Sequence, residues 1–230
     1  MSESERTVLD RRATPQGEAQ LQRRATPQGE LAYEIILNGV FIMASYNQAS
    51  ERALATLALP SGVPAGPGSM RVLVGGLGMG YTLQAVLEHR QVGSVDVVEI
   101  EPAVVDWHRR FLGGLSGHSL DDPRVRLVEM DIVRFLAGDI GPYRAICLDV
   151  DNGPGWLAVN SNRRLYSTWG LGRLRGLLAP GGVLTVWSAA PARAFAARLG
   201  RVFGQAEAHP VVSNDPWGHE LAAYIYRAVR

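Results

Sequence analysis

The sequence is poor in cysteine, and this limits the kinds of protein it can encode. Its 230 residues contain one cysteine, Cys147, inside the apolar run AICLDV, where we expect a small buried thiol. A single cysteine cannot form an intramolecular disulfide, so a disulfide-dependent secreted fold is not expected. The histidines show no ligand spacing with one another or with Cys147, and we therefore expect no metal site.

Long apolar runs and strong net charge are also missing. No stretch approaches the roughly 20 apolar residues that cross a bilayer. The first twelve residues, MSESERTVLDRR, are polar and contain no apolar signal core, so we expect a cytoplasmic protein without a membrane partner. The net charge of +1 gives no electrostatic reason to expect a nucleic-acid partner.

A short repeat marks the beginning of the chain. The octapeptide RRATPQGE occurs at 11–18 and again at 23–30, and two copies are too few for a solenoid. Two interpretations stay open: a local duplication in a polar segment, or two turns at Pro-Gln-Gly that each begin a short strand. We assign residues 1–17 to a polar lead-in whose order is left open.

A β-hairpin and a helix are expected next, in a small unit at 18–59. Asn38-Gly39 separates the β-prone runs LAYEIIL and VFIMASY, and both positions of such a turn need positive φ. Residues 48–58 have a helical pattern with Ser50 as the expected N-cap. The stretch PSGVPAGPGS at 60–69 is rich in Pro and Gly and is expected to link this unit to the main domain at 70–230.

The main domain alternates strand and helix patterns. Strands are expected at 71–75, 94–100, 124–130, 144–150 and 182–188, with helices near 80–90, 102–112, 132–138, 163–179 and 191–203. Two further strands, AEAHPVV and ELAAYIYRAV, suit an antiparallel pair at the sheet edge. This order predicts an α/β fold: a seven-stranded, mostly parallel Rossmann-like sheet with helices on both faces and a C-terminal antiparallel pair.

The first strand of this domain runs into a glycine cluster, VLVGGLGMGYT. Gly76, Gly78 and Gly80 give the spacing G-x-G-x-G, with Gly75 before them, and a helix follows. Such a loop brings backbone N–H groups close to a ligand. The spacing differs from the dinucleotide pattern G-x-G-x-x-G and favours the loop type that binds S-adenosylmethionine (AdoMet).

Two acids at strand ends support nucleoside binding. Glu99 ends the second strand, where a carboxylate can accept both ribose hydroxyls. Asp131 follows the third strand, where an acid is well placed to receive an adenine amino group. Either residue can instead be a helix cap, but their order together with the terminal strand pair favours AdoMet-type binding.

These segments resemble the spermidine synthase family. The resemblance covers about 70–190 and is carried by VLVGGLGMGYTLQAVLEH, VDVVEIEPAVVDWHRRFL, DDPRVRLVEMDIVRFL, YRAICLDVD and LYSTWGLGRLRGLLAPGGVLTVWS. It implies a class I AdoMet-methyltransferase fold, transfer of an aminopropyl group from decarboxylated AdoMet to a diamine, and a homodimer. Plant putrescine N-methyltransferases, which use AdoMet itself, belong to the same family, so methyl transfer is the alternative.

The nucleoside half of the family pattern matches this chain. The residues expected to bind the cofactor are Gly75, Gly76, Gly78, Gly80, Glu99, Ile100, Asp131, Ile132 and Asp149. The resemblance makes Asp149, at the end of the fourth strand, the base that takes a proton from the attacking amine.

The amine half of the pattern departs from the family. Gly78 stands where the family loop has an aspartate. The family follows its strand-four acid with Ser-Ser-Asp-Pro, whereas this chain follows Asp149 with Val150-Asp151-Asn152-Gly153-Pro154. Asp151 replaces the second acid, or Asn152 stands there without charge. The family's Tyr-His pair is missing, although Glu51 matches the acid beside it. The acceptor therefore stays open.

Residue chemistry indicates which roles these positions can have. An amine must lose a proton before it attacks a sulfonium donor, and a partly desolvated carboxylate suits that task. Asp149 and Asp151 share a face if the strand extends to 151; otherwise one of them caps the following turn. The expected catalytic residues are Asp149 and Asp151, and the expected substrate-binding residues are Glu51, Asn152, Trp156, Tyr166 and Trp187.

Three functional hypotheses follow. The first is a transferase that uses AdoMet or decarboxylated AdoMet as co-substrate and a small amine as acceptor. The second is a nucleoside-binding protein of the same fold without catalysis. The third is an NAD-dependent oxidoreductase, which the glycine spacing and the terminal strand pair disfavour.

Overall fold

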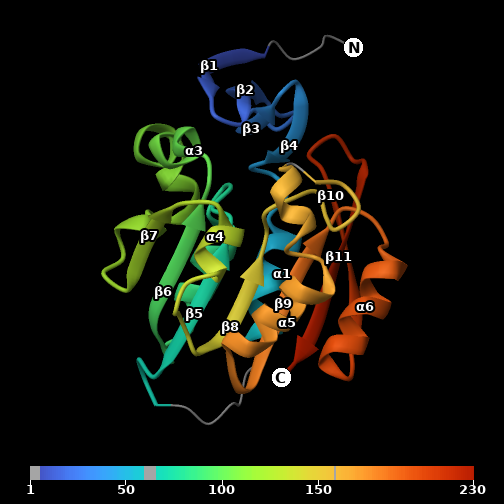
Figure 1. Cartoon of the computed structure of the whole chain (residues 1–230). Coiled ribbons are helices and arrows are strands. Elements are labelled where there is room, and N and C mark those ends of the chain that lie inside the picture. Colours follow the sequence, from blue (N-terminus) through green and yellow to red (C-terminus); the bar gives the residue numbers. More distant parts are fainter. Residues whose placement is uncertain (1–5, 60–65, 158) are drawn as a thin grey trace.

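A computed structural model describes residues 6–59, 66–157 and 159–230, which form a small sheet and a larger one (Figure 1). The small sheet has the order β1-β2-β3-β4 and all its pairs are antiparallel. Its strands are β1 (Thr7–Thr14), β2 (Gly17–Ala25), β3 (Leu31–Leu37) and β4 (Val40–Ala44). The predicted hairpin joins β3 to β4, with φ of 51° at Asn38 and 73° at Gly39.

The repeat at the beginning of the chain forms turns and strands, so the assignment of residues 7–17 to a polar lead-in is wrong. Strands β2 and β3 each begin just after a Pro-Gln turn of the repeat. The strands form although their sequence is polar, because their polar side chains pair: Arg11 donates to Gln20, and Gln22 donates to Glu34 at 2.6 Å. Residues 1–5 lie outside the described part of the chain.

Helix α1 (Ala49–Ala58) matches the predicted helix, but its N-cap is Gln48 and not Ser50. The Ser50 hydroxyl instead donates to the Glu51 carboxylate at 2.8 Å. Leu54 and Ala55 of this helix are fully buried against the larger sheet. Within the expected linker, residues 60–65 are not among the described residues.

The larger sheet has seven strands in the order β10-β11-β9-β8-β5-β6-β7. Its strands are β5 (Met70–Gly75), β6 (Val92–Glu99), β7 (Val125–Glu129), β8 (Tyr143–Leu148), β9 (Leu178–Ser188), β10 (Glu207–Asn214) and β11 (Glu220–Val229). Strands β9, β8, β5, β6 and β7 are parallel, whereas β11 runs antiparallel to both β9 and β10. The predicted fold class is confirmed.

Helices cover both faces of the larger sheet and enclose two apolar cores. Their bounds are α2 (Tyr81–Leu87), α3 (Pro102–Trp107), α4 (Ile132–Leu136), α5 (Thr168–Leu177) and α6 (Arg193–Phe203). Helices α1, α2 and α3 pack on one face and α4, α5 and α6 on the other. Residues of β5 alternate between the two cores, with Val72 and Val74 in the first and Leu73 in the second. Short turns of π-helix and 3₁₀-helix extend α3 at 108–112, 113–116 and 119–121, and another lies at 160–163.

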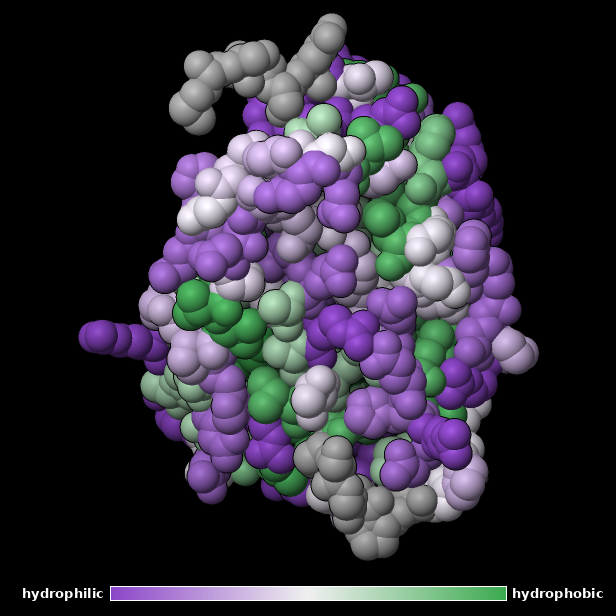
Figure 2. Space-filling view, turned by 180° about the vertical axis from the view of Figure 1, so that it is seen from behind, coloured by the Kyte–Doolittle hydropathy of each residue, from purple (hydrophilic) through white to green (hydrophobic). Residues whose placement is uncertain are grey.

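The small sheet lies over the carboxyl ends of the parallel strands (Figure 1). The Trp107 indole donates to Asp10 of β1 at 2.8 Å, and the Tyr81 hydroxyl donates to the Ser45 carbonyl at 2.8 Å. From behind, the surface is largely polar, with apolar residues in separate patches (Figure 2). Within the described residues, no helix has the length and apolar character needed to span a membrane.

Candidate active site

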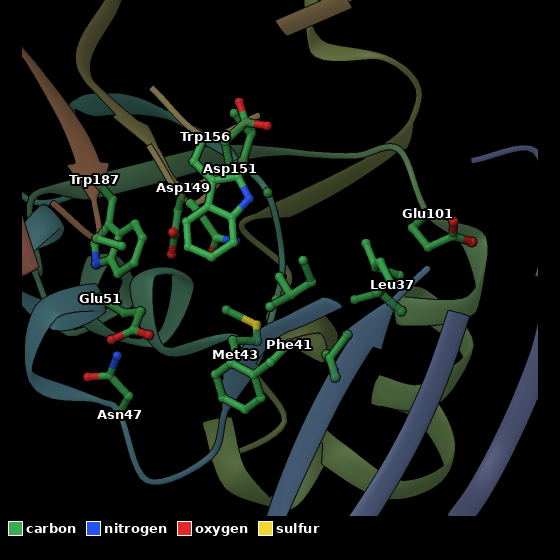
Figure 3. A pocket seen from close by; sticks show the side chains of 18 of the residues that line it. Leu37, Phe41, Met43, Asn47, Glu51, Glu101, Asp149, Asp151, Trp156 and Trp187 are labelled. Carbon is green, nitrogen blue, oxygen red and sulfur yellow. The ribbon is translucent and has the colours of Figure 1, made fainter. Parts of the chain in front are cut away.

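A cavity of about 450 Å³ lies between the small sheet and the carboxyl ends of the parallel strands. The β3–β4 hairpin and α1 supply one side of it, and the segments that follow β5, β6, β7, β8 and β9 supply the other. Open α/β sheets bind ligands at this edge. In Figure 3, Leu37 and Glu101 lie at one end of the cavity, and Glu51, Asn47 and Trp187 lie at the other.

The glycine loop adopts backbone conformations that favour glycine. Gly76 has φ of 87°, and a Cβ added there would lie 2.0 Å from the Asp149 carbonyl oxygen. Gly78 has φ of 51°, and its added Cβ would lie 2.5 Å from Cε of Met43. Both glycines line the cavity, whereas Gly75 and Gly80 are absent from its lining. The Met43 thioether therefore packs where a side chain at position 78 would begin.

Glu99 lies at the end of the cavity where the sequence predicts a nucleoside, and this end is called the nucleoside end. Its carboxylate accepts hydrogen bonds from the backbone N–H groups of Leu77 and Glu101, both at 2.8 Å. Burial raises the pKa of this carboxyl group, and the two backbone hydrogen bonds oppose that rise. Each oxygen keeps a lone pair for a ligand hydroxyl. Beside Glu99, the apolar side chains of Ile100 and Ile132 line the cavity.

Asp131 has a structural role in the described contacts. It is the N-cap of α4, and its side chain accepts from the Val133 N–H at 2.7 Å. Met130 and Ile132, on either side of it, line the cavity, but Asp131 does not. A contact between Asp131 and adenine stays a prediction.

The opposite end of the cavity carries a cluster of acids. Asp149 follows β8 and Glu51 lies in the first turn of α1, so segments about a hundred residues apart meet here. Burial raises the pKa of Asp149 to about 6, and the charge of Glu99 contributes to the rise. Burial, followed by the charge of Asp149, raises the pKa of Glu51 to about 8.

Asp149 and Asp151 both line the cavity, although β8 ends at Leu148 and the strand does not extend to 151 as a shared strand face would require. Asp151 also accepts from the Tyr166 hydroxyl at 2.9 Å and from the Val159 N–H at 3.4 Å, so it organises the following loop as well. Tyr166 is only 3% exposed and does not line the cavity. A contact between Tyr166 and a ligand stays a prediction; in this structure its hydroxyl donates to Asp151 from within the core.

The other predicted acceptor residues reach the cavity. Asn152, Trp156 and Trp187 belong to its lining, and Trp156 is 59% exposed at the rim. The prediction missed Phe41, Met43 and Asn47, which the hairpin and the loop after it bring to the cavity (Figure 3). The Asn-Gly turn revealed the hairpin, but no local pattern revealed which surface it covers. Among the described residues, no group of three or more His, Cys, Asp or Glu is arranged to hold a metal ion.

The sheet order, with a glycine loop after β5 and a buried acid at the end of β6, defines an α/β protein with the fold of AdoMet-dependent transferases. Residues 52–191 match the family model "Spermine/spermidine synthase domain", and the chain belongs to this family.

Curated relatives show the same affiliation over part of their length. The chain is 36% identical over 128 residues to polyamine aminopropyltransferase 1 of Streptomyces coelicolor, covering 55% of this chain and 23% of that protein. It is 34% identical over 123 residues to polyamine aminopropyltransferase 1 of Pseudomonas aeruginosa, covering 53% and 41%. It is 39% identical over 84 residues to putrescine N-methyltransferase 1 of Nicotiana tabacum, covering 36% and 22%. The matched segments thus span less than half of each relative.

Solved structures share the fold. A spermidine synthase in complex with the transition-state analogue AdoDATO superposes with a TM-score of 0.78 at 18% identity, covering 96% of this chain and 73% of the other. The spermidine synthase from Thermotoga maritima gives a TM-score of 0.75 at 16% identity, covering 96% and 72%.

Proposed function

We propose that this protein transfers an aminopropyl group from decarboxylated AdoMet to a small amine. The observation that carries this proposal is the charge of the cavity. Its described lining contains six carboxyl side chains and neither Arg nor His, and the whole sequence contains no lysine. The six are Glu51, Glu99, Glu101, Asp149, Asp151 and Glu220.

The acidic lining favours the decarboxylated donor over AdoMet itself. Decarboxylated AdoMet carries a sulfonium and an ammonium group, and both are attracted to carboxylates. AdoMet carries an additional carboxylate, which would lose hydration without gaining a cationic side chain. A protonated amine acceptor is attracted to the same acids.

Asp149 suits the role of base. A pKa of about 6 leaves it mostly ionised at neutral pH and still basic enough to accept a proton. The protonated amine first gives a proton to Asp149, which frees the lone pair of its nitrogen. The nitrogen then bonds to the propyl carbon as the carbon–sulfur bond breaks, its electrons stay on sulfur, and methylthioadenosine leaves. Glu51, with a pKa of about 8, is mostly protonated at neutral pH and adds little repulsion.

The names of the relatives support this proposal, since two of them are polyamine aminopropyltransferases. The Nicotiana relative is named a putrescine N-methyltransferase, so methyl transfer is the outcome that an experiment must separate. Residues Glu99, Ile100 and Ile132 would hold the nucleoside, and Asn152, Trp156 and Trp187 would border the acceptor. A homodimer and a cytoplasmic location stay predictions.

The test incubates the purified protein with each donor and a panel of diamines, polyamines and monoamines. We expect methylthioadenosine from decarboxylated AdoMet, and turnover with AdoMet at least about 100-fold slower. Production of S-adenosylhomocysteine from AdoMet would instead establish methyl transfer. Binding of methylthioadenosine without turnover on any amine would favour a non-catalytic binder, and binding of NAD alone would contradict the proposal.

A further inference from the structure

Thr82 occupies an unusual position beside the acid cluster. It lies in the first turn of α2 and is 3% exposed. Its Oγ1 is 3.1 Å from the backbone carbonyl oxygen of Glu51 and 3.3 Å from Oδ2 of Asp149. A hydroxyl has one proton and two lone pairs, so it donates to one of these oxygens at a time and can accept from another group.

We propose that Thr82 is the positioning residue of Asp149 and that it reverses its hydrogen bond when Asp149 changes protonation state. With Asp149 ionised, Thr82 donates to Oδ2. With Asp149 protonated, Oδ2–H donates to Oγ1 of Thr82, and the threonine proton rotates toward the Glu51 carbonyl. This inference rests on the proposed role of Asp149 as the base.

Each arrangement gives both the Thr82 hydroxyl and Oδ2 of Asp149 a hydrogen-bond partner. In the ionised state the Asp149 oxygen accepts from Thr82, and in the protonated state the new O–H has an acceptor and the threonine proton has the Glu51 carbonyl. An unsatisfied buried polar group is costly, and an arrangement that satisfies only one state would resist proton transfer. The geometry of Thr82 suits a carboxyl group that cycles between both states.

Several ionisable groups surround Asp149, so the hydrogen bond from Thr82 affects the pKa of Asp149. The ionisable groups that face it are Glu51 from α1, Glu99 from β6, Asp151 and Tyr166 from the segment after β8, and Cys147 on its own strand. Burial and the charge of Glu99 raise the pKa of Asp149, whereas the hydrogen bond from Thr82 lowers it. Thr82 therefore helps to keep Asp149 ionised near neutral pH.

Thr82 also ties Asp149 to α1. Its contact with the Glu51 carbonyl joins the first turn of α2 to the first turn of α1, and the Glu51 carboxyl group lines the cavity. The same hydroxyl thus reaches the two elements that carry the acids. Its loss should change the titration of Asp149 more than the binding of the nucleoside, because Glu99 is held by backbone N–H groups.

The test compares Thr82→Val with Thr82→Ser and Thr82→Ala. Thr82→Val keeps the shape but removes the hydroxyl, so the pKa of Asp149 should rise by about one pH unit. The acidic limb of the kcat/KM profile should shift by the same amount, so kcat/KM should fall about tenfold at pH 5 but only about twofold at pH 7, and the Kd for methylthioadenosine should stay within about threefold. Thr82→Ser should restore the wild-type profile, and Thr82→Ala should repeat the shift if valine impairs folding.

Thr185→Val is the matched control. Thr185 is also fully buried, and its hydroxyl donates to a backbone carbonyl of α1, that of Leu54, at 3.1 Å. It has no described hydrogen bond to a carboxylate, so its removal should leave the profile unchanged. An unchanged Asp149 pKa in both Thr82→Val and Thr82→Ala would overturn the inference, as would an equal shift in Thr185→Val.

A second readout separates this inference from the proposed function. Carboxyl ¹³C NMR, with the Asp149 signal assigned through Asp149→Asn, measures the titration without any substrate. If the wild-type protein turns over no amine, the proposed function fails, yet the NMR shift between wild type and Thr82→Val still decides the role of Thr82.

Discussion

The two ends of the cavity are built in different ways. At the nucleoside end, Glu99 is held by backbone N–H groups of Leu77 and Glu101, which belong to adjoining strand ends. At the acid end, the Thr82 side chain of α2 contacts both the Asp149 carboxylate and the backbone carbonyl of Glu51 in α1, so these contacts join separate elements. The first arrangement follows from strand order, and the second depends on tertiary packing.

This difference predicts which functions can vary independently. Backbone contacts are preserved when neighbouring side chains change, so the nucleoside end tolerates changes at the acid end. Substitutions can therefore separate the two ends experimentally.

The largest effect is expected at the acid end from Asp149→Asn. An amide cannot take the amine proton, so kcat should fall by about 10² to 10⁴. The Kd for methylthioadenosine, measured by calorimetry, should change less than about threefold. Asp139→Asn, which changes an exposed carboxylate, is the control and should leave both quantities unchanged. Equal losses of binding and turnover in Asp149→Asn would show that the two ends are not separable.

Glu99→Ala should produce the converse result at the nucleoside end. Removing the carboxylate loses the proposed ribose contacts and two backbone hydrogen bonds, so the Kd for methylthioadenosine should rise about 100-fold. With saturating donor, kcat should fall less than about tenfold. Glu99→Gln keeps one acceptor oxygen and should give an intermediate Kd. A fall in kcat at saturation as large as that of Asp149→Asn would contradict the comparison.

The sequence was informative where local geometry determines the site. The alternation of strands and helices predicted the larger sheet, and the glycine spacing led to Gly76 and Gly78 in the cavity lining. Glu99 was found because it ends a strand next to the loop strand. These features depend on contacts between the ends of neighbouring strands. The strand pattern of the sequence shows where those ends lie.

Features that depend on packing were harder to predict. Tyr166 was expected at the ligand but lies behind Asp151, and Met43 was not predicted at all. Strand β1 was missed because its pairing uses polar side chains such as Arg11 and Gln20 in place of apolar alternation. In each case the partner lies in another element, and the local sequence does not identify it.

The smallest effect concerns stability and comes from Glu51→Gln. The folded pKa of Glu51 is about 8, whereas its ordinary value is 4.5. Between these values the folded protein keeps a proton that the unfolded chain releases, so stability falls as pH rises from about 4.5 to 8. Glutamine does not titrate in this range. The free energy of unfolding of Glu51→Gln should therefore fall less steeply than that of wild type as pH rises.

Urea unfolding without ligand at pH 5 and pH 8.5 measures the effect. Between the two pH values, the free energy of unfolding should fall less in Glu51→Gln than in wild type, by at least about 1–2 kcal/mol. Glu129→Gln, which changes an exposed carboxylate on β7, should follow the wild-type pH dependence. Because Glu51 belongs only to the acid end, its replacement should leave the Kd for methylthioadenosine unchanged. An identical decline in Glu51→Gln and wild type would mean that Glu51 is ionised in the folded protein and that the acid end is less desolvated than its burial implies.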